Sequence, residues 1–453
     1  LVDGLAPQAT LDEALRAGVV VGNELDGRRA CMLAHHILRL RSPCALLVHH
    51  DALALPAVGL FDRVLCDVPC SSDGTIRKAP QLWHSWRPNR GNVVHAVQLR
   101  IACAGATRLA EGGLMVYSTC SLNPVEDEAV VAALLQRAEG GLELVDCRGL
   151  PELPRASGLG SWSVLAGSRN NPNPSVLQSP ADARQHHLLL SESLWPPKQE
   201  GLHLERCWRL FPHMGNSGGF FVALLRRTSK ALPENFEVCD TPDADAEDLP
   251  EDAVCKDALP ASQHQEPFLP AALSEHRPRL EKVLEFFGLE CVPVENLFLR
   301  GNDIRNVYLV SDGVRDILLS SSDLQPVIAG VRIFEENRYL KTCDCELRLA
   351  QAGVQLLAAS MRRRCEASYD DLLTLLKGEV VKFIDFPQGS LLRSSLEAIE
   401  SQGSVAVVGE FRGARLCVAA ERGEKMVRAF VKQEEKTELL AALDEIVRAS
   451  PSR

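Results

Sequence analysis

Short apolar runs alternate with longer amphipathic segments over the first half of the chain. Four runs have the length and composition of buried strands, at residues 19–21, 45–48, 63–66 and 114–117. Between the last two runs, apolar side chains recur at intervals of three and four residues, which predicts a helix that contains Val94, Val97, Ile101 and Ala104. The repetition of strand, helix and strand predicts an α/β fold with a doubly wound, parallel sheet.

The second half of the chain mixes the two kinds of pattern. A helix is expected at 279–288, and strands are expected at 306–310, 380–384 and 405–408. The chain closes with a helical pattern at 434–449, whose apolar face carries Leu439, Leu440, Leu443, Ile446 and Val447. These elements predict a smaller α+β domain with a terminal helix.

The distribution of charge divides the chain. Its 453 residues include 49 Lys and Arg against 60 Asp and Glu, a formal net charge of −11. The segment 233–266 holds eleven acids and one lysine, so the rest of the chain is nearly neutral and a nucleic-acid partner is not excluded. Four prolines and repelling charges predict a disordered connector. We therefore expect a first domain at 1–230, an acidic disordered linker at 231–269 and a second domain at 270–453.

Composition also excludes some classes of protein. No apolar run approaches the roughly 18 residues that cross a bilayer, and the first twenty residues carry acids where a signal peptide needs a basic start and an apolar core. The 15 cysteines are irregularly spaced, which favours reduced thiols in an intracellular protein. The sequence Cys343-Asp344-Cys345 invites a metal interpretation, but no histidine follows His276. Because Cys291, Cys365 and Cys417 also lack the paired spacing of a zinc site, no metal is expected.

Acidic residues follow two of the predicted strands. In a doubly wound sheet, ligands collect beyond the carboxyl ends of the strands. Glu24 stands where an acid can accept both hydroxyls of a ribose, and Asp51 stands where an acid can accept the amine of an adenine. The alternative is a pair of solvated strand-end or helix-cap acids, and spacing alone favours that alternative.

Two cysteines follow the other two strands. The first strand ends in Asp67, turns through Pro69 and presents Cys70, while the second ends in a Ser-Thr-Cys sequence at Cys120. A proline before Cys70 restricts the backbone and so aims the thiol, and the acids after Pro124 suit the start of a helix. Either cysteine alone is equally well explained as a small buried residue. Two at the ends of neighbouring strands would face one crevice, which favours chemistry.

The motifs that surround these cysteines resemble a known enzyme family. DVPCSSDGTIRK, the tryptophans at 83 and 86, QLRIA, EGGLMVYSTCSLNPVEDEAVV and RLFPHMGNSGGFFVALL together resemble the Sun-domain RNA cytosine-5 methyltransferases, in particular their eukaryotic tRNA branch. The resemblance covers residues 15–227. Residues 270–453 resemble the PUA-like RNA-binding domain of that branch through RNVYLVSDGVRDILL and CELRLAQAGV. The implied fold is a Rossmann-like class I methyltransferase sheet followed by a smaller α+β PUA-like domain.

The resemblance implies catalytic roles for three residues. Cys120, in the TC motif, would be the nucleophile that forms a covalent intermediate with the cytosine, and Cys70, in the PC motif, would assist product release. Asp67 would hydrogen-bond the ring nitrogen of the base as charge builds there. The base must be unstacked to be reached.

The resemblance also implies S-adenosylmethionine as the cofactor. Glu24, Asp51 and Asp67 would surround its ribose, adenine and methionine end, respectively. The family more often has Asp at the position of Glu24, which makes Asp26 the alternative ribose ligand. The family's Gly-containing loop after the first strand would precede Leu1, so we expect that the chain lacks an N-terminal piece.

The expected partner is tRNA, bound by a monomer in the nucleus or nucleolus, with no membrane and no metal involved. Two alternatives stay open: a catalytically inactive RNA-binding scaffold, and the same enzyme acting on ribosomal RNA. Basic side chains around the crevice and in the second domain are candidates for phosphate contacts, although solvated charge is the commoner explanation for any one of them: Arg77, Lys78, Arg87, Arg90, Arg206, Arg209, Arg226, Arg227 and 362–364.

Overall fold

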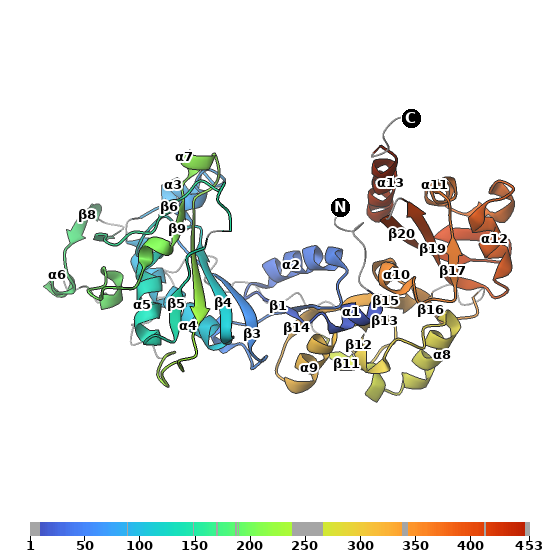
Figure 1. Ribbon diagram of the computed structural model, residues 1–453, viewed down its shortest axis with the longest axis horizontal. Coiled ribbons are helices and arrows are strands. Elements are labelled where there is room, and N and C mark those ends of the chain that lie inside the picture. The colour runs from blue at the N-terminus through green and yellow to red at the C-terminus, as the bar shows by residue number, and fades with distance from the viewer. Residues whose placement is uncertain are drawn as a thin grey trace. The chain divides into compact units, whose positions relative to one another are not determined.

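The computed structural model describes residues 10–87, 89–147, 149–168, 171–185, 188, 190–237, 266–337, 343–411 and 414–448. The chain forms two compact units. We call Asp51–Asp257 the central unit, and we call Leu1–His50 together with Ala258–Arg453 the composite unit. In Figure 1 the central unit runs from light blue to green, and the composite unit combines dark blue with yellow to red.

The central unit is built on one mixed sheet. Its strands follow the order β3 (Phe61–Asp67), β4 (Leu109–Thr119), β10 (Phe220–Arg227), β9 (Trp208–Leu210) and β6 (Ala156–Ser157), with β5 (Leu142–Leu144) also paired to β10. β3 and β4 are parallel, with Asp67 opposite Ser118, whereas β4 and β10 are antiparallel. Among the described residues β3 pairs only with β4, and Leu65 on this edge strand is 71% exposed.

Two helices cover the sheet of the central unit. α4 (Arg90–Thr107) and α5 (Glu128–Ala138) pack against each other, and their apolar residues join those of β3, β4 and β10 in one core. The α5 sequence EAVVAALLQRA is rich in helix-forming Ala and Leu, and nearly all of its side chains are buried. Because α5 begins shortly after β4 ends, its N-terminus lies close in sequence to the Ser-Thr-Cys motif.

The rest of the central unit consists of short elements: α3 (Leu82–Ser85), the hairpin of β7 (Val164–Ser168) and β8 (Asn171–Leu177), α6 (Pro180–Gln185) and α7 (Pro212–Gly215). A small apolar cluster around Trp195 and Leu177 ties the hairpin to the residues near Val125.

The composite unit joins elements from both ends of the chain. β1 (Val20–Asn23) pairs in parallel with β2 (Ala45–Val48), and β2 pairs antiparallel with β14 (Pro326–Ala329). Figure 1 shows α2 (Gly27–Leu40) beside this sheet, and α1 (Leu11–Arg16) contacts α9 (Asp312–Ser320). Segments more than 250 residues apart in sequence are therefore packed together.

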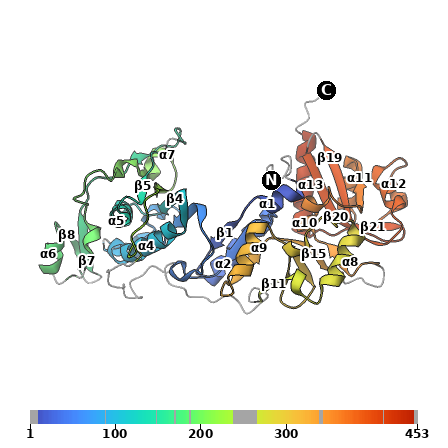
Figure 2. The ribbon, with the colours of Figure 1, turned by 60° about the horizontal axis from the view of Figure 1, so that its bottom comes forward.

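Two five-stranded sheets complete the composite unit. The first has the order β11 (Phe268–Pro270), β12 (Leu297–Arg300), β13 (Asn306–Leu309), β15 (Val331–Glu336) and β16 (Leu347–Leu349). The second has the order β17 (Arg364–Glu366), β19 (Gly403–Phe411), β20 (Ala414–Arg422), β21 (Met426–Ala429) and β18 (Val381–Lys382). The surrounding helices, seen in Figure 2, are α8 (Arg277–Phe287), α10 (Gln351–Leu357), α11 (Tyr369–Lys377), α12 (Leu391–Ala398) and α13 (Gln433–Arg448).

The predicted elements are largely present. The four strands of the first half correspond to β1, β2, β3 and β4, and the helix between the last two corresponds to α4. In the second half, the helices at 279–288 and 434–449 correspond to α8 and α13, and the strands at 306–310 and 405–408 lie in β13 and β19. The strand expected at 380–384 is shorter, because β18 gives way to a 3₁₀ turn at Phe383–Asp385.

The pairing of the strands differs from the expected single sheet. β1 and β2 pair with each other and with β14, whereas β3 and β4 belong to another sheet, and residues 10–50 fall in the same compact unit as the second half of the chain. All four residues of β2 are buried, and such a strand needs a neighbour on each edge. An apolar run predicts that a strand forms, but it does not predict which strands pair with it. Here β14 is the second neighbour of β2.

The expected acidic linker is folded at both of its ends. Phe236 is only 3% exposed in the core of the central unit, and the segment 268–270 forms β11. The intervening residues 238–265, on which the prediction of disorder mainly rests, lie outside the described residues.

Candidate active site

Two thiols meet at the ends of neighbouring strands. Cys70 follows β3 and Cys120 follows β4, and their Sγ atoms lie 3.2 Å apart without a disulfide bond. Because β3 and β4 are parallel, both loops leave the same edge of the sheet. Cys70 is buried, with 2% exposure, whereas Cys120 is half-buried. The structure thus brings together the two cysteines that the sequence singles out, and Cys120 is the more accessible.

The loop after Cys70 makes a tight turn against the loop after β4. Ser72 has a left-handed backbone, with φ of 61°, and its hydroxyl lies 3.5 Å from Cys120 Sγ. The Gly74 amide donates to the carbonyl of Cys120 (2.9 Å), and the Gly219 amide donates to the carbonyl of Gly74 (2.8 Å). A Cβ at position 74 would lie 2.7 Å from each of the carbonyl oxygens of Cys120 and Gly219, so this close approach requires glycine.

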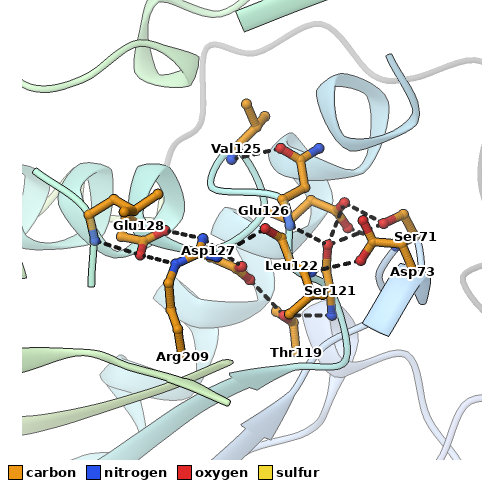
Figure 3. Close-up of polar contacts among 12 residues, drawn as sticks. Ser71, Asp73, Thr119, Ser121, Leu122, Val125, Glu126, Asp127, Glu128 and Arg209 are labelled. Carbon is orange, nitrogen blue, oxygen red and sulfur yellow. Dashed lines mark hydrogen bonds and ion pairs between the residues drawn. The ribbon is translucent and has the colours of Figure 1, made fainter. Parts of the chain in front are cut away.

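A buried carboxylate connects the two cysteine loops, as Figure 3 shows. Oε2 of Glu126 accepts a hydrogen bond from the Ser71 amide (2.7 Å). Oε1 of Glu126 accepts from the hydroxyls of Ser71 (2.6 Å) and Ser121 (2.9 Å). These serines directly follow the two cysteines in the sequence. One side chain therefore holds the backbone next to both thiols.

Two further contacts fix these loops. The side-chain amide of Gln98 in α4 donates to the carbonyl of Pro69 (2.9 Å) and to Oε2 of Glu126 (3.3 Å). The carboxylate of Asp73 accepts from the amide of Leu122 (2.6 Å). The residues on both sides of Cys70 and the residue after Cys120 are thus tied to one network that includes helix α4.

Two more buried acids share one arginine at the start of α5. Arg209 donates to both carboxylate oxygens of Glu128, at 2.6 and 2.8 Å, and to Asp127 at a longer 3.3 Å. It also donates to the carbonyl of Leu122 (3.0 Å), and Asp127 accepts from the hydroxyl of Thr119 (2.6 Å). Figure 3 shows this network beside that of Glu126. The bidentate geometry makes Glu128 the main ionic partner of Arg209.

Burial and neighbouring charges shift the pKa of several groups here. The pKa of the Cys70 thiol is raised, first by its hydrogen bond to Cys120 and then by burial and by the nearby charges of Cys120 and Glu126. Burial raises the pKa of Glu126, although the hydrogen bonds from Ser71 oppose the shift. Cys70 therefore keeps its proton and is able to donate it to the Cys120 sulfur.

The predicted acids Asp67 and Asp51 both lie in the central unit. Asp67 ends β3, two residues before Pro69, and its exposed carboxylate accepts from the Ser118 hydroxyl (2.9 Å). Asp51 is also exposed, and it caps a short 3₁₀ turn by accepting from the amide of Leu53 (2.9 Å). The carboxylate of Asp67 leaves the same strand end as Cys70, whereas Asp51 performs the capping role that was the alternative expectation.

Glu24 and Asp26 belong to the composite unit. Oε1 of Glu24 accepts from the Asp26 amide (2.9 Å) and from the guanidinium of Arg29 (2.8 Å). Asp26 caps α2 by accepting from the amide of Arg29 (2.9 Å). The three predicted cofactor acids are therefore divided between the two units, and the structure does not by itself bring Glu24 together with Asp51 and Asp67.

The sequence analysis missed the structural importance of the acids after Pro124. It treated 126–128 as a helix start, yet all three side chains have 0% exposure and α5 begins only at Glu128. It also grouped Arg209 with possible phosphate contacts, whereas Arg209 is 3% exposed and bound to Glu128. The sequence gives no direct signal of this burial, because three consecutive acids between a Thr-Cys motif and an apolar helix equally suit a solvated helix start.

Within the described ranges, His, Cys, Asp and Glu form no group of three or more with the arrangement of a metal site. None of the helices that the structure describes is both long and apolar enough to cross a membrane.

Family comparisons define the class of the protein. Residues 9–150 match the family model for the 16S rRNA methyltransferase RsmB/F, and residues 270–362 match the NSUN2 Pre-PUA domain. A solved chain described as a methyltransferase homolog protein from Pyrococcus horikoshii is 24% identical with a TM-score of 0.32, covering 46% of this chain and 53% of that chain. The two family matches define a methyltransferase domain followed by a Pre-PUA domain, in a chain of mixed α/β structure.

The curated relatives give the particular branch. The chain is 35% identical to the multisite-specific tRNA:(cytosine-C(5))-methyltransferase trm4b of Schizosaccharomyces pombe, over 84% of this chain and 62% of the relative. It is 30% identical to the tRNA (cytosine(34)-C(5))-methyltransferase of Drosophila melanogaster, over 96% and 64%, and to the multisite-specific enzyme of Saccharomyces cerevisiae, over 96% and 67%.

The chain thus spans about two thirds of the length of these relatives. It belongs to the Sun-domain RNA cytosine-5 methyltransferase family, in the branch of the eukaryotic tRNA enzymes. The resemblance carried by the two cysteine motifs is confirmed.

Proposed function

We propose that this chain carries the catalytic part of an RNA cytosine-5 methyltransferase that acts on tRNA with S-adenosylmethionine as methyl donor. The observation that carries the proposal is the pair of thiols 3.2 Å apart at the ends of two parallel strands. Transfer RNA is favoured over ribosomal RNA because the named tRNA enzymes align with 84 to 96% of the chain, whereas the ribosomal RNA family model matches residues 9–150.

The chemistry begins with addition of a thiolate to the base. Carbon 5 of cytosine is too electron-poor to take a methyl group, and addition of Cys120 Sγ to carbon 6 makes carbon 5 nucleophilic. The half-buried Cys120 is the thiol that an unstacked base reaches, while the buried Cys70 keeps its proton because its pKa is raised. Once Cys120 is a thiolate, the protonated Cys70 thiol is the donor of the hydrogen bond between the two sulfurs, and this bond holds the attacking sulfur in place.

The remaining roles follow from position. Asp67 ends the strand that leads to Cys70, and we assign it the hydrogen bond to the ring nitrogen, where charge builds during addition. After carbon 5 has gained a methyl group, it must lose its proton so that the bond between carbon 6 and Cys120 Sγ can break. Solvent water takes the carbon 5 proton, the electron pair of that bond restores the double bond of the base, and the Cys120 sulfur leaves as a thiolate. The protonated Cys70 assists this release by donating a hydrogen bond to the departing sulfur.

S-adenosylmethionine supplies an electrophilic methyl group when it is bound. The exposed carboxylates of Asp51 and Asp67 fit its hydroxyl and amine donors, because an ionised carboxylate only accepts hydrogen bonds. Glu24 remains the proposed ribose acceptor, with Asp26 as the alternative. The second half of the chain, including its Pre-PUA region, would bind RNA, and the enzyme would act as a monomer in the nucleus or nucleolus, as the family resemblance implies.

The test is capture of the covalent intermediate. When the Cys70→Ala protein is incubated with bulk tRNA and S-adenosylmethionine, it should accumulate a protein–RNA adduct that survives a denaturing gel. The adduct should vanish when Cys120→Ala is added, while Cys291→Ala, at an exposed cysteine of the composite unit, should leave it unchanged.

Each other outcome contradicts a defined part of the proposal. Methylation by the parent protein without any adduct in Cys70→Ala would show that the two cysteine roles are wrong. A parent protein that binds tRNA but neither methylates nor captures it would favour the inactive RNA-binding scaffold. Methylation of ribosomal RNA in preference to tRNA would overturn the assigned substrate.

A further inference from the structure

The proposed mechanism leaves Glu126 without a role, although this side chain is completely buried between the two cysteine loops. Within the network of Figure 3, it contacts the residue that follows each cysteine. The side-chain amide of Gln98 donates both to this carboxylate and to the carbonyl of Pro69, the residue before Cys70, and so links the two. Positions on both sides of Cys70 and the position after Cys120 therefore depend on one acid.

We propose that Glu126 is a positioning residue that sets the separation and orientation of the Cys70 and Cys120 thiols. The inference rests on the proposed function for its importance in catalysis, whereas its structural content concerns this chain alone. Glu126 contacts neither thiol directly in the structure, and it acts through Ser71 and Ser121.

The hydrogen bonds require a carboxylate at this position. Four donors converge on Glu126: the amide and hydroxyl of Ser71, the hydroxyl of Ser121 and the side-chain amide of Gln98. An ionised carboxylate offers acceptor sites on both oxygens, whereas the amide of Gln would direct two N–H groups toward donors. Glu126→Gln keeps the shape of the side chain and removes half of its accepting capacity.

The neighbouring buried acid provides a matched control. Glu128 has the same 0% exposure as Glu126, but its carboxylate accepts from Arg209 and from the amide of Leu159. Glu128→Gln therefore disturbs a buried ionic group without removing a hydrogen bond to Ser71 or Ser121. Glu143→Gln, at an exposed acid of β5, controls for a change of charge at the surface.

The first measurement is independent of RNA and of the proposed activity. Diamide takes two electrons and two protons from a pair of thiols, which leaves a disulfide and the reduced hydrazine form of the reagent. Thiols 3.2 Å apart should form this bond readily, and its rate is measured by peptide mapping for the Cys70–Cys120 link. We expect Glu126→Gln to slow the rate by about tenfold, because misaligned thiols rarely reach bonding geometry.

The second measurement connects this geometry to catalysis. In the Cys70→Ala background, the rate of adduct formation with tRNA should fall by about tenfold or more in Glu126→Gln, since small displacements of a reacting group are costly. Ser121→Ala, which removes a single bond and leaves the carboxylate, should show a smaller loss of the same kind. All rates are taken at a temperature at which each variant is folded by circular dichroism.

The outcomes separate this inference from the proposed function. Slow disulfide formation in Glu126→Gln with normal rates in Glu128→Gln and Glu143→Gln supports positioning, even if no variant captures tRNA. Equal losses in Glu126→Gln and Glu128→Gln would reduce Glu126 to a structural acid and overturn the inference. If Glu126→Gln does not fold, an unchanged disulfide rate in Ser121→Ala overturns the inference in its place.

Discussion

A single glycine allows three segments of the chain to meet beside the thiols. The backbone of Gly74 accepts from one strand-end loop and donates to another, so the turn after Cys70, the turn after β4 and the start of β10 share one point. No side chain fits there, because two carbonyl oxygens lie 2.7 Å from where a Cβ would stand. At the scale of the residue, the packing of these loops depends on the absence of a side chain at position 74.

We expect Gly74→Ala to destabilise the central unit by about 1–3 kcal/mol, because backbone atoms cannot yield to the added methyl group as a flexible side chain does. Gly218→Ala is the matched control, since nothing lies within 4 Å of its ideal Cβ. Urea denaturation followed by circular dichroism measures both. Equal unfolding midpoints for the two variants would contradict the close approach seen at Gly74.

At the scale of the element, the start of α5 is a cluster of acids with 0% exposure. One guanidinium serves two of them, and its bidentate bonds go to Glu128. Desolvation, followed by the charge of Glu128, raises the pKa of Asp127 well above its ordinary 3.8, and Arg209 only partly opposes this shift. Ionisation of Asp127, the residue directly before α5, is therefore unfavourable in the folded protein.

This shift predicts a pH dependence of stability. A folded-state pKa above the unfolded value means that the folded protein binds more protons between the two values, so the stability that Asp127 contributes falls as pH rises from about 3.8 toward the raised pKa. Asp127→Asn cannot ionise and should lose this decline. Within that window, the free energy of unfolding of Asp127→Asn minus that of the wild type should increase by about 1.4 kcal/mol for each unit that the pH rises.

The measurement is a series of urea denaturation curves of the two proteins between pH 4 and pH 8. Parallel pH profiles for the wild type and Asp127→Asn would show that Asp127 has an ordinary pKa in the folded protein. Asp146→Asn, in the loop after β5, serves as a control for a change of one carboxylate.

Part of the fold and of the candidate site could be predicted from the sequence, and the individual elements show which part. Strand and helix positions follow from apolar periodicity, and the pairing of Cys70 with Cys120 follows from motifs at the ends of two strands. The partner of β2 could not be predicted, because a strand that is apolar on both faces fits any sheet edge. The role of Glu126 could not be predicted either, because burial of an acid depends on tertiary contacts that a charged sequence pattern does not reveal.

At the scale of the whole molecule, the first fifty residues fold with the last two hundred. β14 completes the sheet of β1 and β2, and Ile328 stands opposite Leu47 in that pairing. The expected boundary near residue 230 would instead place residues 45–48 in the same domain as β3. In the structure, residues 45–48 should unfold together with β14, whereas the expected boundary predicts that they unfold together with β3.

We expect Ile328→Asp to expose the amides of residues 45–48 to hydrogen exchange, because an unpaired charge at this 3% exposed position costs several kcal/mol. The amides of β3 and β4 should keep their protection. Leu319→Asp, at a 56% exposed position of α9, should change neither region. Unchanged protection at 45–48 in Ile328→Asp would show that β2 does not depend on its pairing with β14.

The edge strand β3 has a consequence for the behaviour of the protein in concentrated solution. Leu65 stands exposed on a strand that, among the described residues, has a neighbour on one side only, and such an edge is a template for aggregation. Its sequence FDRVLCD places Asp62, Arg63 and Asp67 along the strand, and pairing with a second molecule would strip water from these charges. Asp67, the proposed partner of the base, therefore has a second consequence for the protein: its charge lies on an exposed sheet edge and opposes aggregation there.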